Sequence, residues 1–293
     1  MPDQPNTLIL QLYTIQDESS YHLKNEPGEI QRLNVIDDLC AGLLLQSHLL
    51  GVVHGRLSPG GDPATLVIMS FEFQGQDQAR RFQHAEIKVR FADEKQPLDA
   101  DPEVHSLWPE GDFSFSESQA TVSQTLGSEV NASGQAVGFL SVGLAGNWAR
   151  TIEGTRTDRA SLKGARRIEE REWGKKNVVR LVIHENETQK SGIPSRVSAA
   201  MLLRRKENSE SRFVAYVEVN AKAGKRYQAA KALRKVRGAT PLNDPVIFDP
   251  ASSNSSGILR DIHSDDLGAV GLESLAQVIS TTMLSTVRGK QGI

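Results

Sequence analysis

Strict alternation of apolar and charged residues is the sequence feature that most constrains this fold. Residues 84–92 (HAEIKVRFA) are apolar at every odd position from 85 to 91 and charged at the even positions between them. Because successive side chains of a strand point to opposite faces, this pattern predicts a half-buried strand. Residues 65–74 (TLVIMSFEFQ) predict a more fully buried strand, which we expect to pair with it.

Other segments extend this strand-rich picture. Further strands are expected at 136–145, 178–184, 199–204 and 212–221, whereas residues 33–50 fit a helix or a strand. One helix is expected at 223–237, with a narrow apolar stripe formed by Ala229, Ala232, Leu233 and Val236. A second helix is expected to begin near Ser264. The predicted fold class is α+β, a strand-rich twisted antiparallel sheet with peripheral helices.

Length and composition indicate an ordinary globular protein. The chain has 293 residues, of which 38% are hydrophobic and 24% charged, enough to bury a sizeable core. The single cysteine, Cys40, fits a reducing compartment. The N-terminal sequence lacks the pattern of a signal peptide, and no run of about 18 apolar residues is present. We therefore expect a water-soluble protein that is cytoplasmic at rest.

Charge is distributed very unevenly along the chain. Residues 1–149 hold 8 basic and 20 acidic residues, residues 150–237 hold 23 and 10, and residues 238–293 hold 3 and 6. A basic segment inside an acidic chain predicts a surface for an anionic partner: phospholipid head groups, nucleic acid, or the chain's own acidic parts.

No catalytic or metal-binding motif is present. Cys40 lies in an apolar context without a basic neighbour, which favours an inert buried thiol over a nucleophile. The seven histidines have no zinc-ligand spacing, and no phosphate-binding or nucleophile-elbow motif occurs. We expect no enzymatic activity, no cofactor and no metal.

The basic segment fits a membrane better than a nucleic acid. Aromatic residues are sparse in 150–237, so stacking platforms for bases are not predicted, and we expect no specific nucleic-acid partner. Residues 131–146 (NASGQAVGFLSVGLAG) are glycine-rich, nearly uncharged and roughly alternating, as membrane-inserting strands are. An ordinary strand in water is the other interpretation of that segment.

Several phrases between residues 173 and 250 resemble the fungal gasdermin-like proteins, which are cell-death effectors of heterokaryon incompatibility. These phrases are Trp173-Gly174, HEN at 184–186, SGIP at 191–194, FVAYVEV at 213–219 and DPVIFDP at 244–250. The resemblance covers about the C-terminal 40% of the chain and its overall length. It adds to the fold class a likeness to the gasdermin N-domain.

This resemblance implies a pore-forming precursor activated by proteolysis. Residues 1–240 would be the pore-forming domain, 241–257 an exposed linker and 258–293 an autoinhibitory tail. An activating protease would cut in the linker, with Phe248 as the candidate cleavage residue. The freed domain would then bind acidic phospholipids, form a self-oligomer and permeabilise the plasma membrane.

Two groups of residues follow from the same resemblance. The tail would cover a complementary patch through Leu267, Val270, Leu275, Val278, Ile279 and Met283. The lipid-binding cations would be Arg159, Lys163, Arg166, Arg167, Lys225, Arg226, Lys231, Arg234, Lys235 and Arg237, each worth about 1 kcal/mol near a membrane surface.

Two other function classes remain open. A β-rich intracellular small-molecule-binding protein or enzyme would show a deep pocket with converging polar groups. A nucleic-acid-associated protein would line one groove with its basic residues.

Overall fold

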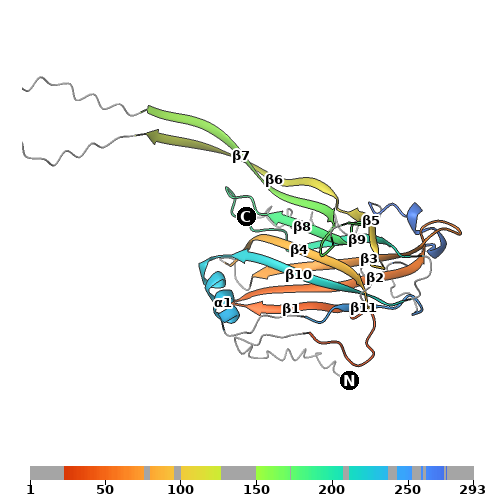
Figure 1. Cartoon of the computed structure of the whole chain (residues 1–293). Coiled ribbons are helices and arrows are strands. Elements are labelled where there is room, and N and C mark those ends of the chain that lie inside the picture. The colour runs from red at the N-terminus through yellow and green to blue at the C-terminus, as the bar shows by residue number, and fades with distance from the viewer. Residues whose placement is uncertain are drawn as a thin grey trace, which may run out of the picture.

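The chain folds into two antiparallel β-sheets packed face to face, as the computed structural model shows (Figure 1). The structure describes residues 23–75, 80–95, 100–126, 150–171, 173–206, 211–236, 243–252, 259, 262–273 and 275. Within these ranges the protein has eleven strands, one α-helix and one short 3₁₀ helix. The expected strand-rich α+β class is therefore confirmed.

The first sheet has five strands in the order β1-β2-β3-β9-β5. Residues 33–50, which fit either a helix or a strand, form most of β1 and β2. Ala41 and Gly42 join these two strands, and both have positive φ, as a tight two-residue hairpin turn requires. The strands are β1 (Asn34–Cys40), β2 (Leu43–Arg56), β3 (Pro63–Gly75), β9 (Arg196–Arg204) and β5 (Glu103–Trp108).

The second sheet has six strands in the order β11-β10-β4-β8-β7-β6. The expected pairing of residues 65–74 with 84–92 is wrong, because β3 pairs with β2 and β9, whereas β4 pairs with β10 and β8. Alternation fixes which face of a strand is buried but not which strand lies beside it. The strands are β11 (Val246–Phe248), β10 (Phe213–Ala223), β4 (Phe82–Asp93), β8 (Val178–His184), β7 (Arg150–Arg167) and β6 (Gly111–Leu126).

The main hydrophobic core lies between the two sheets. Phe71 and Met201 enter it from the first sheet, and Phe91 and Leu181 enter it from the second; all four are fully buried. Burying a side chain of this size contributes about 1.5–3 kcal/mol relative to leaving it exposed. The alternating residues of β4 thus face the core as predicted.

Helix α1 (Lys225–Val236) packs through Tyr227 instead of the expected apolar stripe. The side chain of Tyr227 is 3% exposed, and its ring meets that of Phe82 edge to face with centroids 5.7 Å apart. Leu233, which was expected to be buried, is 46% exposed. A tyrosine ring offers much more apolar surface than the stripe's alanines, so it determines which side of the helix turns inward.

Candidate functional site

The hairpin formed by β6 and β7 projects well beyond the sandwich (Figure 1). Its pairing runs from Gly111 opposite Gly164 to Leu126 opposite Arg150, with one irregularity between Phe115 and Ser118. At about 3.3 Å per residue, a 16-residue strand such as β6 spans roughly 50 Å. We call residues 118–126 and 150–158 the hairpin arm.

Both edges of the hairpin arm are open in the part of the chain that the structure describes. Strand β6 is the last strand of its sheet, and β7 pairs with β8 only over residues 161–167. Residues 150–158 therefore pair with β6 alone among the described strands. Open edges are templates for pairing with another strand.

The register of the hairpin arm separates two kinds of residue. On β7, even positions from 150 to 158 are in register with Ala160 and Leu162, whose side chains are buried in the sandwich. Opposite them on β6 stand positions 120, 122, 124 and 126. By sequence, this set contains Ala120, Val122, Leu126 and Ile152, and also Gln124, Arg150, Gly154, Arg156 and Asp158. The odd positions on both strands are mostly serine and threonine. The sequence of the arm thus alternates between positions that mix apolar and charged residues and positions rich in hydroxyl groups.

The glycine-rich segment 131–146, with its two interpretations, and the strand expected at 136–145 lie outside the described residues. The sequence analysis missed the flanking strands themselves, although Ala120, Val122 and Ile152 alternate with serine or threonine as a strand pattern requires.

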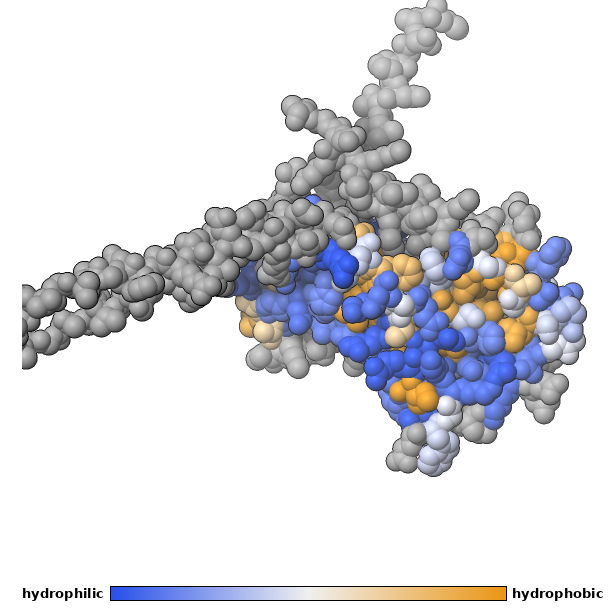
Figure 2. Space-filling view, turned by 90° about the horizontal axis from the view of Figure 1, so that it is seen from above, coloured by the Kyte–Doolittle hydropathy of each residue, from blue (hydrophilic) through white to orange (hydrophobic). Residues whose placement is uncertain are grey.

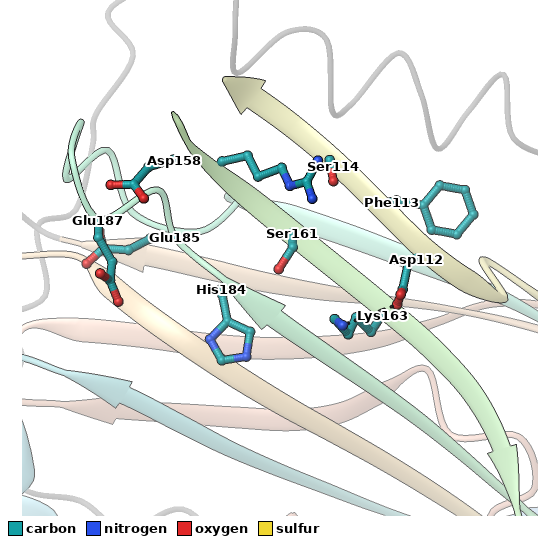
Figure 3. Close-up of a pocket in the computed structure, with 10 residues that line it drawn as sticks. Asp112, Phe113, Ser114, Asp158, Ser161, Lys163, His184, Glu185 and Glu187 are labelled. Atoms are coloured by element: carbon teal, nitrogen blue, oxygen red, sulfur yellow. Dashed lines mark ion pairs between the residues drawn. The ribbon is translucent and has the colours of Figure 1, made fainter. Parts of the chain in front are cut away.

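An open depression of about 380 Å³ lies at the base of the arm (Figure 3). Strands β6, β7 and β8 and the turn after β8 line it. Asn186 in that turn is fully buried and donates from Nδ2 to the carbonyl of Asp158 at 2.9 Å, which ties the turn to the base of the arm. The lining residues are Asp112, Phe113, Ser114, Asp158, Arg159, Ser161, Lys163, His184, Glu185 and Glu187.

The predicted lipid-binding cations do not share one strand or one helix. Four of them, Arg159, Lys163, Arg166 and Arg167, lie on β7. Lys225, Arg226, Lys231, Arg234 and Lys235 lie on α1, which follows β10, and β4 and β8 separate β10 from β7 in the sheet. Arg237 lies outside the described residues. Their lipid-binding role stays a prediction.

Ion pairs between the two halves of the sequence neutralise much of the basic segment. Arg166 Nε lies 2.8 Å from Glu110, Arg180 Nε 2.6 Å from Glu86, and Lys163 Nζ 3.6 Å from Asp112. Further pairs of the same kind are Arg171–Asp101, Lys175–Glu103, Arg196–Glu72, Arg204–Asp62 and Arg204–Glu103. The acidic N-terminal half of the chain therefore supplies the partners of these seven cations.

The described surface is correspondingly mixed in character. On the face seen from above, hydrophilic residues predominate and separate several hydrophobic patches (Figure 2). Arg159, Lys163, Arg167, Lys225 and Arg226 are exposed. Exposed ion pairs such as Lys163–Asp112 contribute little to stability, typically below about 1 kcal/mol.

A second hydrophobic cluster lies on the outer face of the first sheet. Val53, Leu66, Ile68 and Leu202 point away from the main core and are at most 7% exposed. The C-terminal segment covers them with Leu259, Leu267 and Leu272, and Leu275 packs at the margin. We call residues 259, 262–273 and 275 the C-terminal cover.

The C-terminal cover approaches the sheet at backbone distance. A Cβ atom added to Gly55 on β2 would lie 1.9 Å from the carbonyl oxygen of Ser264. A Cβ added to Gly268 would lie 2.4 Å from the carbonyl oxygen of Leu57, which accepts a 2.8 Å hydrogen bond from the Gly268 amide. Only glycine permits such contacts.

The residues predicted to cover the main domain from the tail differ in how deeply they are buried. Leu267 is fully buried and Leu275 is partly buried, whereas Val270 is half-buried and lies outside the hydrophobic cluster. Val278, Ile279 and Met283 lie outside the described residues. The segment begins with a 3₁₀ helix, η1 (Ser264–Ala269), in which Asp266 has non-helical angles, so a regular α-helix from Ser264 is wrong over these residues. An inhibitory role of the segment stays a prediction.

Phe248 lies in a strand, so the described part of the linker expected at 241–257 is not exposed throughout. Strand β11 pairs with β10, and the side chains of Val246 and Phe248 are fully buried. The Phe248 ring stacks on that of Phe213 with centroids 4.9 Å apart. Cleavage after Phe248 stays a prediction, and in this fold it requires β11 to leave the sheet edge first. The division of the chain at 240 and 257 also stays a prediction.

Residues 23–32 hold the segment around β11 in place. Asn25 donates its amide to Asp244 at 3.0 Å, and the Gln31 amide donates to the carbonyl of Ile247 at 2.7 Å. Arg32 is 6% exposed and donates to the Asp244 carbonyl at 2.9 Å. These bonds join residues more than 200 positions apart, and nothing in the sequence analysis predicted them.

A buried histidine, His54, also takes part in the contacts between residues 23–32 and the segment around β11. His54 on β2 is 8% exposed. Its Nδ1 lies 3.0 Å from the Thr65 hydroxyl, and its Nε2 lies 2.9 Å from the side-chain nitrogen Nε2 of Gln31. Gln31 in turn donates to Ser252 at 3.0 Å. Burial, reinforced by the charge of Arg205 and opposed by that of Asp249, lowers the pKa of His54 to about 4. His54 is therefore neutral at pH 7.

Comparisons with known proteins give little further information. No protein-family model matches the chain, and no curated protein matches it. One solved structure that it resembles is the Clostridium perfringens NetB toxin in the membrane-inserted form, at 11% identity and a TM-score of 0.24. The match covers 61% of this chain and 84% of that chain. No helix in the described ranges has the length and hydropathy needed to cross a membrane.

Proposed function

We propose that this chain is the precursor of a pore-forming protein in which the hairpin arm supplies membrane-spanning strands. One observation carries the proposal: the arm is a long hairpin with both described edges open. A two-stranded hairpin is marginally stable by itself in water. Pairing with hairpins of further copies would complete its hydrogen bonds and close the strands into a barrel.

The alternation along β6 supports a barrel wall, because Ala120, Val122 and Leu126 alternate with polar residues, whereas the even positions of β7 also include Arg150 and Arg156. A membrane-spanning strand needs about 9–11 residues, with an apolar face toward lipid and a polar face toward the lumen. The arm's pairing from Ser118 to Leu126 covers nine residues on β6, and its hydroxyl-rich odd positions suit a water-filled lumen. The arm is therefore long enough to cross most of the hydrocarbon layer.

The C-terminal cover is proposed to hold the precursor inactive. Its removal would expose the apolar side chains of Val53, Leu66, Ile68 and Leu202. An exposed apolar patch of this kind favours association with lipid or with another protein copy. Cleavage by an activating protease and a role in programmed cell death are proposed from the gasdermin resemblance alone.

Acidic phospholipids are the proposed target. Arg159 and Arg167 on β7 and Lys225 and Arg226 on α1 are exposed and would contact head groups. Because seven other cations of the basic segment pair with carboxylates, we expect weaker lipid attraction than the sequence charge suggests.

A leakage assay on the full chain tests this function. A recognition sequence for a specific protease is placed between Ser252 and Leu259, so that the cut leaves β11 and its attachments in place. Dye-loaded vesicles containing phosphatidylserine should leak after the cut, whereas the uncut protein should leave them intact. Cut protein that remains a monomer and leaves the vesicles sealed would disprove the proposal.

A further inference from the structure

A row of polar residues crosses the outer face of the second sheet beside the base of the hairpin arm. Ser114 on β6 stands opposite Ser161 on β7, and Ser161 stands opposite His184 on β8. His184 stands opposite His84 on β4, and His84 stands opposite Lys222 on β10. Their chain neighbours Ala85 and Ile183 are fully buried in the core, so the histidines face outward.

The two histidines at the centre of this row lie in direct contact. The centroids of the His84 and His184 rings are 4.5 Å apart, and the ring planes are inclined by 43°. His184 is exposed and points into the depression at the base of the arm (Figure 3), whereas His84 is half-buried. The Nδ1 atom of His84 is buried and has no hydrogen-bond partner in the described part of the chain. Two imidazoles thus stand side by side on rigid neighbouring strands.

The charges beside the two histidines are mixed and partly paired, since Glu185 lies 2.8 Å from Arg81 and Asp112 lies 3.6 Å from Lys163. The depression is lined by four carboxylates, Asp112, Asp158, Glu185 and Glu187, and by two cations, Arg159 and Lys163. A neutral imidazole has a nitrogen lone pair available for a metal ion.

We propose that His84 and His184 form a binding site for a divalent transition-metal ion such as zinc. Imidazole nitrogen is a preferred ligand of Zn²⁺, Ni²⁺ and Cu²⁺, and directly opposed residues of neighbouring antiparallel strands are close enough to share one ion. No group of three or more His, Cys, Asp or Glu in the described ranges could hold a metal. The two imidazoles would supply the protein ligands, and water would supply the rest.

A metal ion at this site would join β4 to β8 next to the strand from which the arm projects. It would bind the folded sheet and not the unfolded chain, and would therefore raise the stability of the fold. Lys222 opposes binding because its positive charge stands beside His84 in the row. This site does not depend on the proposed pore-forming function.

Calorimetric titration of tag-free, full-length protein with zinc chloride tests the site. Wild-type protein should bind one zinc ion, and His184→Ala should bind at least about tenfold more weakly. His184 is exposed, so this variant should fold normally. His48→Ala is the matched control, because His48 lies on β2 of the other sheet and contacts Asn34. It should bind zinc as the wild type does.

Two further measurements make the test decisive. Lys222→Ala should bind zinc more tightly than the wild type, and zinc should raise the melting temperature of the wild type but not of His184→Ala. Equal zinc binding by wild type and His184→Ala would overturn the assignment. Stabilisation by inorganic phosphate without stabilisation by zinc would also overturn it, because the site would then be an anion site.

Discussion

Lowering the pH from 7 to 5 should destabilise the fold by about 2 kcal/mol through His54 alone. The pKa of His54 is about 4 in the folded protein, against 6.5 for an ordinary histidine. Between these values the unfolded chain binds a proton that the folded chain does not bind. Stability due to His54 is therefore complete above pH 6.5 and is lost as the pH falls toward 4. The full difference of pKa corresponds to about 3 kcal/mol.

Urea unfolding at a series of pH values measures this effect. His54→Gln serves as the comparison, because glutamine keeps a polar group between Gln31 and Thr65 but does not titrate. The variant should be less stable than the wild type at pH 7, and its loss between pH 7 and 5 should be smaller by about 2 kcal/mol. Ordinary carboxylates titrate mainly below pH 5 and contribute similarly to both proteins.

The surroundings of His54 give the prediction its sign. Arg205 adds to the cost of protonation, and Asp249 reduces it without outweighing burial. Because His54 and Gln31 hold the segment that follows β11, acid should loosen that segment first. Identical pH dependence of wild type and His54→Gln, or a His54 ring that titrates near pH 6.5 by NMR, would refute the reasoning.

Three other substitutions have defined outcomes. Gly55→Ala should displace the C-terminal cover, because the new Cβ collides with the backbone of Ser264. The variant should therefore bind more of a dye that is specific for apolar surface. Gly224→Ala has open space around its new Cβ and should bind no more dye than the wild type. Phe248→Ala should lower the free energy of unfolding by about 3–5 kcal/mol in urea titration, and a loss below 1 kcal/mol would contradict the burial of β11. Val122→Arg should abolish vesicle leakage by the cut protein, whereas Thr121→Arg on the other face should retain it; equal effects would contradict the assigned faces.

The apolar patterns made β3, β4, β8, β9 and β10 predictable, but not β5, β6, β7 or β11, nor the assembly of the strands into sheets. The pattern of residues 84–92 gave β4 and its core face, since side-chain direction depends only on position along the strand. Which strands pair depends on contacts far apart in sequence, so β3 and β4 were wrongly paired. Three-residue β11 lies among prolines, and its pairing with β10 comes from the burial of Val246 and Phe248, which local composition does not reveal.

The sequence contains a signal that the outer face of the first sheet is covered. Residues 66–69 and 199–203 are continuously apolar, and such runs are typical of strands buried on both faces. Gly55 inside a strand likewise indicates a close backbone approach. The charge map was misleading in one respect: acidic and basic blocks that are separate in sequence become neighbours across strands, as Arg180 and Glu86 do. The similarity to the gasdermin N-domain rests on the sequence phrases alone.

Fluorescence of single labelled cysteines along β6 tests the central claim most directly. Cys40 is replaced by alanine, and an environment-sensitive dye is attached in turn at positions 119–126 of the protease-cut protein on phosphatidylserine vesicles. If the hairpin arm forms a barrel wall, positions 120, 122, 124 and 126 should report lipid, and the odd positions should report water. Vesicle leakage with an aqueous signal at every position would contradict the account.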